Sequence, residues 1–337
     1  LDRGMEVFQD EHYNLLIKKK GTKGYENARP LLLHGHMDMV LAKEDWVEQD
    51  MLTEGIRLVV DGDYIRAEGT TLGADNGVGI AFMMCILGST DLPHPPIECI
   101  ITVQEEVGKK GGMLFDPAQV TGKRLIDFNW HKPDTIFAGC AGDISVYYRL
   151  PVTYEPASDD MKFFMLSLEG GLGGHSEFDI NLERANALVT FGRLVNSISK
   201  ECEIHFTELT GGVNRYVIPG NMGSIVAVRL SDVEIAQEVV RKVSEDIRNE
   251  YKLTDEKLAV SFVETEEEKS VMSFADTRKI AKSLRLLPCG VCSMSMEIPG
   301  LVESSSTVAM IETQDNVVSI LSTIPSAVSS RKYDILQ

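Results

Sequence analysis

Long apolar runs and basic residues are both scarce in this 337-residue sequence. No apolar run reaches the roughly 18 residues that a membrane-spanning helix needs, so the sequence predicts no membrane partner. Asp and Glu number 51 against 33 Lys and Arg, which gives a net charge of −18. Nucleic acids bind basic surfaces, so this charge argues against a nucleic-acid partner. No signal peptide is evident, and the chain opens at Leu1 in mid-pattern, so we expect the natural N-terminus to lie upstream.

Cysteine is also sparse, and its positions form no disulfide framework. The six cysteines are scattered, mostly through apolar stretches: Cys85, Cys99, Cys140, Cys202, Cys289 and Cys292. This usage predicts reduced thiols in a cytoplasmic protein. The last two form a CxxC, but no second pair accompanies them to complete a zinc site. We interpret them as buried or incidental thiols.

Strand-like and helix-like segments alternate in the first part of the chain. Residues 29–40 and 97–108 read as strands, 122–130 as a further short strand, and 77–87 as a helix that is apolar nearly all round and therefore buried. This alternation predicts an α/β layered domain over residues 1–142, with a partly parallel sheet. In such sheets the functional side chains gather at the carboxyl ends of the strands.

The pattern changes after residue 142. Strand-like segments at 144–156, 161–170 and 223–231 are interspersed with amphipathic helices at 179–199 and 232–252. We predict an α+β second domain over residues 143–337. Its repeated strand–helix theme raises the hypothesis of two related halves, on architecture alone.

Acidic and histidine side chains stand at the ends of the predicted strands. Because side chains alternate along a strand, His36 and Asp38 should share a face, where one binds a metal and the other orients it. Asp75 occupies a glycine-flanked turn before a helix. Glu105 and Glu106 should lie on opposite sides of a strand end, so that one binds metal and the other takes a proton from water. Taken alone, the His36–Asp38 pair, Asp75 and the glutamate pair are each no more typical of a metal site than of a solvated surface. Their order along the chain favours a metal-dependent hydrolytic site.

Five motifs carry a resemblance to a known family: "HGHMDMV", "GTTLGADNGVGIA", "VQEEVG", "GCAG" and "GGHS…RANA". They closely resemble the aminoacyl-histidine dipeptidases, which are cytosolic non-specific, carnosine-splitting dipeptidases within the di-zinc peptidase and deacylase family. The resemblance runs along essentially the whole chain. It implies an α/β catalytic domain, an inserted α+β lid domain and a homodimer formed through that lid. It also implies that the protein hydrolyses Xaa-His and other dipeptides in the cytoplasm, with water activated on two zinc ions. Manganese or cobalt are the alternative metals.

The same resemblance implies a role for each site residue. His36 would bind one zinc ion with Asp38 as its supporting carboxylate, and Asp75 would bridge both ions. Glu105 would be the general base, Glu106 would bind the other zinc ion, and His175 of the lid would stabilise the oxyanion.

Four departures from the family pattern accompany these matches. Asn129 stands at a metal-ligand position where the family has aspartate, and Asp127, two residues earlier, is the substitute candidate. Tyr216 replaces a substrate-binding asparagine, and Pro325 replaces an arginine that binds the substrate carboxylate. The histidine of an "HAGLECG"-like motif is not found in the chain, so we expect the C-terminal catalytic segment of the family to be absent.

Three hypotheses follow for the function. The first is a metal-dependent dipeptidase. The second is a catalytically impaired relative or fragment that keeps a peptide-binding or scaffold role, with weak and sub-stoichiometric metal binding. The third is a deacylase or amidase on the same fold.

Overall fold

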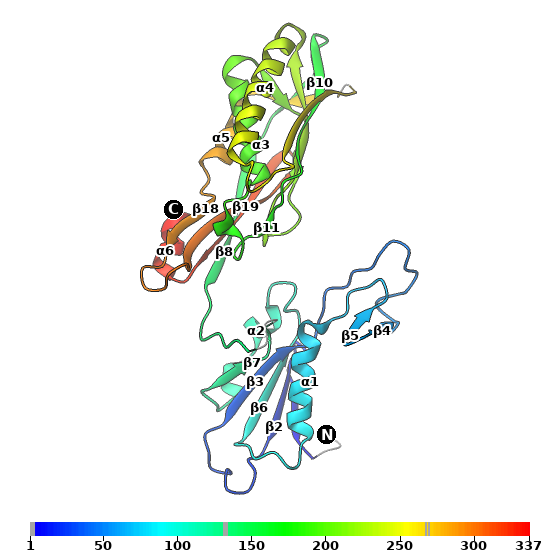
Figure 1. Cartoon of the computed structure of the whole chain (residues 1–337), viewed down its shortest axis with the longest axis vertical. Coiled ribbons are helices and arrows are strands. Elements are labelled where there is room, and N and C mark those ends of the chain that lie inside the picture. Colours follow the sequence, from blue (N-terminus) through cyan, green and yellow to red (C-terminus); the bar gives the residue numbers. More distant parts are fainter. Residues whose placement is uncertain (1–3, 131–133, 267, 269) are drawn as a thin grey trace. The chain divides into compact units, whose positions relative to one another are not determined.

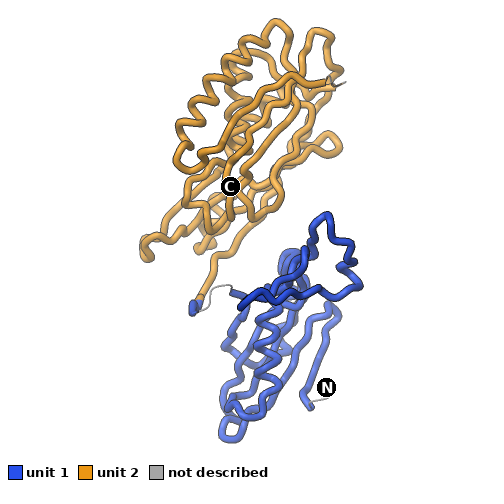
Figure 2. The backbone as a smooth tube through the Cα atoms, turned by 45° about the vertical axis from the view of Figure 1, so that its right-hand side comes forward, with its two compact units in different colours: residues 1–136 blue, residues 137–337 orange. Residues whose placement is uncertain are grey.

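The computed structural model describes residues 4–130, 134–266, 268 and 270–337. The chain divides into two compact units, residues 1–136 and 137–337 (Figure 2). The predicted catalytic stretch "LIDFNWHKPDTIFAGCAG" crosses this division, and its residues 131–133 lie outside the described residues. The assignment of 1–142 and 143–337 as catalytic and lid domains stays a prediction, as do the two related halves.

Unit 1 is built on a five-stranded sheet with the order β1-β2-β6-β3-β7 (Figure 1). β3 runs parallel to both β6 and β7, whereas β2 is antiparallel to β1 and β6, which confirms the predicted partly parallel sheet. The strands are β1 (Glu6–Gln9), β2 (Leu15–Lys19), β3 (Leu31–His36), β6 (Ile97–Thr102) and β7 (Leu125–Asp127). The rest of the unit comprises the hairpin β4 (Leu58–Asp61) and β5 (Tyr64–Ala67), the helices α1 (Ala74–Gly88) and α2 (Lys110–Leu114), and the 3-10 turn η1 (Pro117–Gln119).

α1 covers one face of this sheet with only one of its own faces. Met83 and Leu87 pack with Leu33 and other buried residues of β3 and β6. The prediction that this helix is buried all round was wrong, because Phe82 is 56% exposed and Val78 54% exposed. An apolar helix that contacts a single layer can bury only the stripe that faces that layer.

Unit 2 contains a nine-stranded antiparallel sheet. Its main path is β16-β10-β15-β13-β19-β20-β8, with β12 paired to β15 and β18 paired to β19. The strands are β8 (Gly142–Pro151), β10 (Met161–Glu169), β12 (Ile204–Phe206), β13 (Thr210–Gly211), β15 (Met222–Arg229), β16 (Ala259–Glu264), β18 (Gly290–Met294), β19 (Val302–Gln314) and β20 (Val317–Ser326). Two short pairs lie outside it, β9 (Tyr154–Pro156) with β17 (Ser270–Met272) and β11 (Gly174–His175) with β14 (Val217–Ile218).

The helices of unit 2 complete its predicted α+β architecture. They are α3 (Ala187–Glu201), α4 (Val233–Glu250), α5 (Phe274–Leu286) and α6 (Ser329–Leu336), with 3-10 turns η2 (Ile180–Leu182) and η3 (Leu230–Asp232). α3 starts later than the predicted residue 179 because the Asn186 side chain accepts hydrogen bonds from the amides of Leu188 and Val189 and so caps the helix there. Buried residues of α3, α4 and α5 form one core with the sheet. Within the described ranges, none of the helices combines the length and apolar composition needed to cross a bilayer.

Candidate metal centre

The predicted site residues of unit 1 gather where its parallel strands end. β3 ends at His36 and β6 ends at Thr102, so Asp38, Glu105 and Glu106 all lie in the loops that follow these strands. The prediction that His36 and Asp38 share a strand face, and that the two glutamates flank a strand end, was therefore wrong in its geometry. The residues still converge, because neighbouring parallel strands deliver their following loops to the same edge of the sheet.

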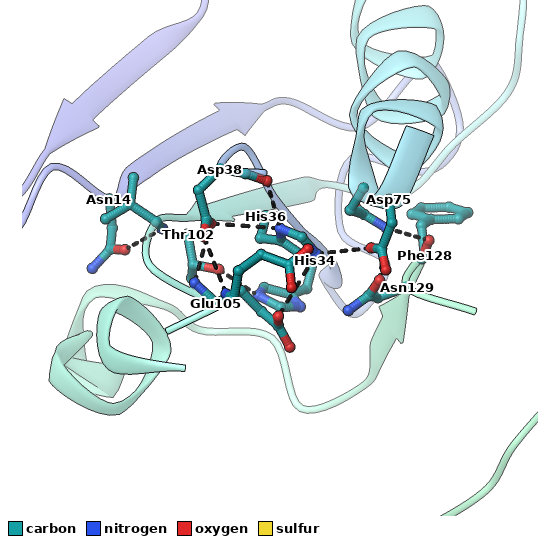
Figure 3. Close-up of polar contacts among 12 residues, drawn as sticks. Asn14, His34, His36, Asp38, Asp75, Thr102, Glu105, Phe128 and Asn129 are labelled. Carbon is teal, nitrogen blue, oxygen red and sulfur yellow. Dashed lines mark hydrogen bonds and ion pairs between the residues drawn. The ribbon is translucent and has the colours of Figure 1, made fainter. Parts of the chain in front are cut away.

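His36 is fully buried, and both of its ring nitrogens face oxygen atoms (Figure 3). Nδ1 lies 3.1 Å from the carbonyl oxygen of Asp38 and 3.5 Å from its carboxylate. Since a carbonyl oxygen only accepts, Nδ1 carries a proton. Nε2 lies 3.0 Å from Asp75 Oδ1 and 4.0 Å from Glu105 Oε2, and so it is the nitrogen available to a cation.

The Asp38 carboxylate holds the loop that carries both glutamates. Its two oxygens accept the backbone N–H groups of Glu105 and Glu106, each at 3.1 Å. Hydrogen bonds to a charged acceptor are stronger than those between neutral groups. Asp38 is thus positioned to orient His36 and to fix the position of the two glutamates at the same time.

Negative charge is concentrated at this edge of the sheet, and it shifts the pKa values of His36 and Glu106. Burial alone would lower the pKa of His36, but the negative charge of Glu105, the hydrogen bond to Asp75 and the proximity of Asp38 outweigh it and raise the pKa. Burial, followed by the like charges of Asp75 and Glu105, raises the pKa of Glu106. Both shifts mean that added positive charge, as a proton or a cation, stabilises the cluster.

Among the described residues, His36, Asp75 and Glu106 form the only group of three possible metal ligands. Each offers one ligand atom, and these atoms lie within 4.8 Å of one another. Imidazole nitrogen and carboxylate oxygen are ligands of Zn²⁺ and of other divalent transition metals. The donor set, and the orientation of the His36 ring by Asp38, therefore fit a divalent ion. Asp75 lies at the start of α1 with non-helical backbone angles, and its side chain is 73% exposed, which leaves this side of the cluster open.

Asp127 and Asn129 lie outside this group. Asp127 Oδ1 is 3.1 Å from Nδ1 of His34, and Asn129 Oδ1 accepts a hydrogen bond from Asn76 Nδ2 at 3.1 Å. Sequence reasoning missed His34 and Asn76. The available signal for His34 was its position two residues before His36, on the same face of the strand.

The residues predicted for the lid lie in unit 2. His175, in β11, accepts the backbone N–H groups of Glu177 and Phe178 at Nδ1, at 3.1 and 3.4 Å, so its proton is on Nε2. Its ring stacks on that of Tyr216, with 6.1 Å between the ring centroids. The Arg215 guanidinium lies 4.5 Å from the centroid of the Tyr216 ring. His175 is therefore a hydrogen-bond donor through Nε2.

At the position of the missing arginine, Pro325 of β20 pairs with Asp143 of β8, and Asp143 forms an ion pair with Arg215. The strand neighbour of Pro325 is thus an acidic residue that is paired with an arginine from another segment of the chain.

Comparisons with known proteins find relatives that match nearly the whole chain and others that match part of it. Residues 166–255 match the M20 peptidase dimerisation domain. The cytosol non-specific dipeptidase of Escherichia coli K12 is 30% identical over 331 residues, which cover 98% of this chain and 68% of that protein. The crystal structure of the aminoacylhistidine dipeptidase from Vibrio alginolyticus superposes with a TM-score of 0.79 at 30% identity, covering 99% of this chain and 68% of that one. An uncharacterized Bacillus subtilis protein, YqjE, is 32% identical over 132 residues, 36% of this chain and 32% of its own length.

Proposed function

This chain belongs to the family of the aminoacyl-histidine and cytosol non-specific dipeptidases, and on that premise we propose that it hydrolyses dipeptides at a divalent-metal centre built by unit 1. The observation that carries the proposal is the convergence of His36, Asp75 and Glu106 within 4.8 Å at the carboxyl edge of the sheet. The family is metal-dependent in general, and we propose zinc as the metal, with manganese or cobalt as functional replacements.

His36, Asp75 and Glu106 would hold the ion, which when bound acidifies a water molecule and polarises the peptide carbonyl. Asp38 orients His36 through the Nδ1 proton and holds the glutamate loop by its two backbone amides. We assign Glu105 as the general base. Its carboxylate lies 4.0 Å from His36 Nε2, at the border of the cluster, where it can accept a proton from water and return it to the leaving amine.

We assign further roles to two residues of unit 2, His175 and Tyr216. His175 would donate a hydrogen bond from Nε2 to the developing oxyanion, an assignment supported by the two backbone amides that occupy Nδ1. Tyr216 would contact the substrate. The dimerisation-domain match points to a homodimer, and we propose that unit 2 forms it. Cytoplasmic location is proposed from the cytosolic dipeptidase relative.

The test is an assay of the purified chain on Xaa-His and Xaa-Gly dipeptides after removal of metal and after addition of zinc, manganese or cobalt. We expect turnover that requires metal and that falls by roughly 10²–10⁴-fold in Glu105→Gln, the usual contribution of a general base. Glu44→Gln, at an exposed position of the same unit, is the matched control. Turnover without metal, or unchanged turnover in Glu105→Gln, would refute the proposal, and hydrolysis of N-acetyl amino acids in place of dipeptides would favour the deacylase hypothesis.

A further inference from the structure

His34 contacts polar side chains of both neighbouring strands, through an ion-pair contact on one side and a hydrogen bond on the other. Its Nε2 lies 3.1 Å from Thr102 Oγ1 in β6 (Figure 3). Its Nδ1 lies 3.1 Å from Asp127 Oδ1 in β7. Both ring nitrogens of His34 therefore have a polar neighbour, a carboxylate at Nδ1 and a hydroxyl at Nε2. Thr102 is only 3% exposed, so its hydroxyl depends on this partner.

The strand register separates Asp127 from the metal cluster. Asp127 is the direct partner of His34 in the β3–β7 pair, two residues before the strand reaches His36. A parallel strand rises about 3.3 Å per residue, so Asp127 lies roughly 6.6 Å short of the level of His36 along the strand direction. Asp127 therefore contacts His34 and is not part of the ligand group formed by His36, Asp75 and Glu106.

Asn129 lies two residues beyond the end of β7 and is held by a second network. Asn76, which is 4% exposed, donates from Nδ2 to the carbonyl oxygen of Phe128 at 2.8 Å and to Asn129 Oδ1 at 3.1 Å. Because the Phe128 carbonyl can only accept, the amide orientation of Asn76 is fixed and Asn129 must present its oxygen to it. The one Asn129 atom able to bind a cation therefore already serves a buried donor, and it is a neutral amide oxygen rather than a carboxylate.

We propose that these two networks keep Asp127 and Asn129 out of metal coordination, with His34 as a positioning residue, so that the chain binds one divalent ion at His36, Asp75 and Glu106 and not two. This inference rests on the proposed function and refines it. His34 is thereby assigned a structural role, although His34 lies only two residues from the metal ligand His36 and on the same strand face. It also revises the predicted metal-binding roles of Asp127 and Asn129.

The test titrates Zn²⁺ into the full chain labelled with ¹⁵N at its histidines, followed by calorimetry and by the NMR signals of the ring nitrogens. We expect one zinc ion per chain, a shift of the His36 ring nitrogens, and unchanged His34 ring nitrogens. His34→Gln and His36→Gln assign the signals. Asp127→Asn should shift the His34 ring nitrogens while leaving the zinc Kd within about twofold, whereas Glu106→Gln should weaken zinc binding by about tenfold or more, as expected for loss of a charged ligand.

Two zinc ions per chain, or movement of the His34 ring nitrogens on zinc addition, would overturn the inference and leave the proposed dipeptidase intact. A tenfold loss of zinc affinity in Asp127→Asn would overturn it as well. No zinc binding at all would contradict both the single ion and the proposed metal centre. If Asp127→Asn fails to fold, the ring-nitrogen shifts and stoichiometry of the unsubstituted chain still decide the question.

Discussion

Replacing Asp38 by alanine should weaken both the folding of unit 1 and its affinity for metal. The carboxylate accepts two backbone amides, those of Glu105 and Glu106, and lies 3.5 Å from His36 Nδ1. Hydrogen bonds to charged groups contribute about 1.5–3 kcal/mol each, but Asp38 is 23% exposed and water can replace part of the loss, so we expect the free energy of unfolding to fall by about 2–4 kcal/mol. Asp38→Ala keeps the backbone carbonyl that lies 3.1 Å from His36 Nδ1, but it removes the carboxylate that holds the loop of Glu105 and Glu106. Loss of a group that supports a metal ligand, here Glu106, typically lowers metal affinity by about 10–100-fold.

The assay can follow unit 1 separately, because both tryptophans of the chain, Trp46 and Trp130, belong to it. Urea unfolding monitored by tryptophan fluorescence gives the stability of this unit, and calorimetry gives the zinc Kd. Asp61→Ala is the matched control, since Asp61 forms an exposed ion pair with Arg66 in the same unit and such pairs contribute about 0–1 kcal/mol. If Asp38→Ala has the stability and zinc affinity of this control, Asp38 does not organise the centre.

Three further substitutions test separate parts of the structure. Gly35→Ala should destabilise unit 1 by about 1–3 kcal/mol in the same fluorescence assay, because its Cβ would lie 2.5 Å from Asn76 Oδ1; unchanged stability would show that this contact can relax. Burial raises the pKa of Asp276, but hydrogen bonds from Lys279, the Thr153 amide and Ser273 outweigh it, so the pKa is lowered on folding. Asp276 therefore stabilises unit 2 above its unfolded pKa of about 3.9, and Asp276→Asn should destabilise the unit at neutral pH, in circular dichroism, with a difference that disappears as the pH falls through the lowered pKa; a constant difference would refute this. Asn129→Asp supplies a second carboxylate oxygen beside the one that accepts from Asn76, so it should add a second, weaker zinc-binding event in calorimetry; an unchanged titration would mean that the missing charge at position 129 is not what prevents a second ion.

Local sequence patterns were sufficient for the strand that ends at His36 and for the non-helical backbone of Asp75 at the start of α1. The apolar run 31–33 fixes the strand, and the flanking glycines indicate the turn. Local patterns were not sufficient to predict the hydrogen bonds of Asp38. The strand ends at His36, and the Asp38 carboxylate in the following loop accepts backbone amides from residues far along the chain, such as Glu105.

The pairing of His34 with Asp127 also escaped prediction. It depends on the register between β3 and β7, which lie some ninety residues apart and share no local signal. The exposed side of α1 has a similar origin. Its composition predicts burial, but the number of layers that contact a helix is a tertiary property.

The most direct test of the central claim is the rate of dipeptide hydrolysis measured while zinc is titrated into the metal-free chain and into Glu106→Gln. Hydrolysis should appear as the unsubstituted chain binds its metal, and Glu106→Gln at the same zinc concentrations should show little or none. Equal hydrolysis by the two chains, or hydrolysis that is independent of zinc, would contradict a catalytic metal centre at His36, Asp75 and Glu106.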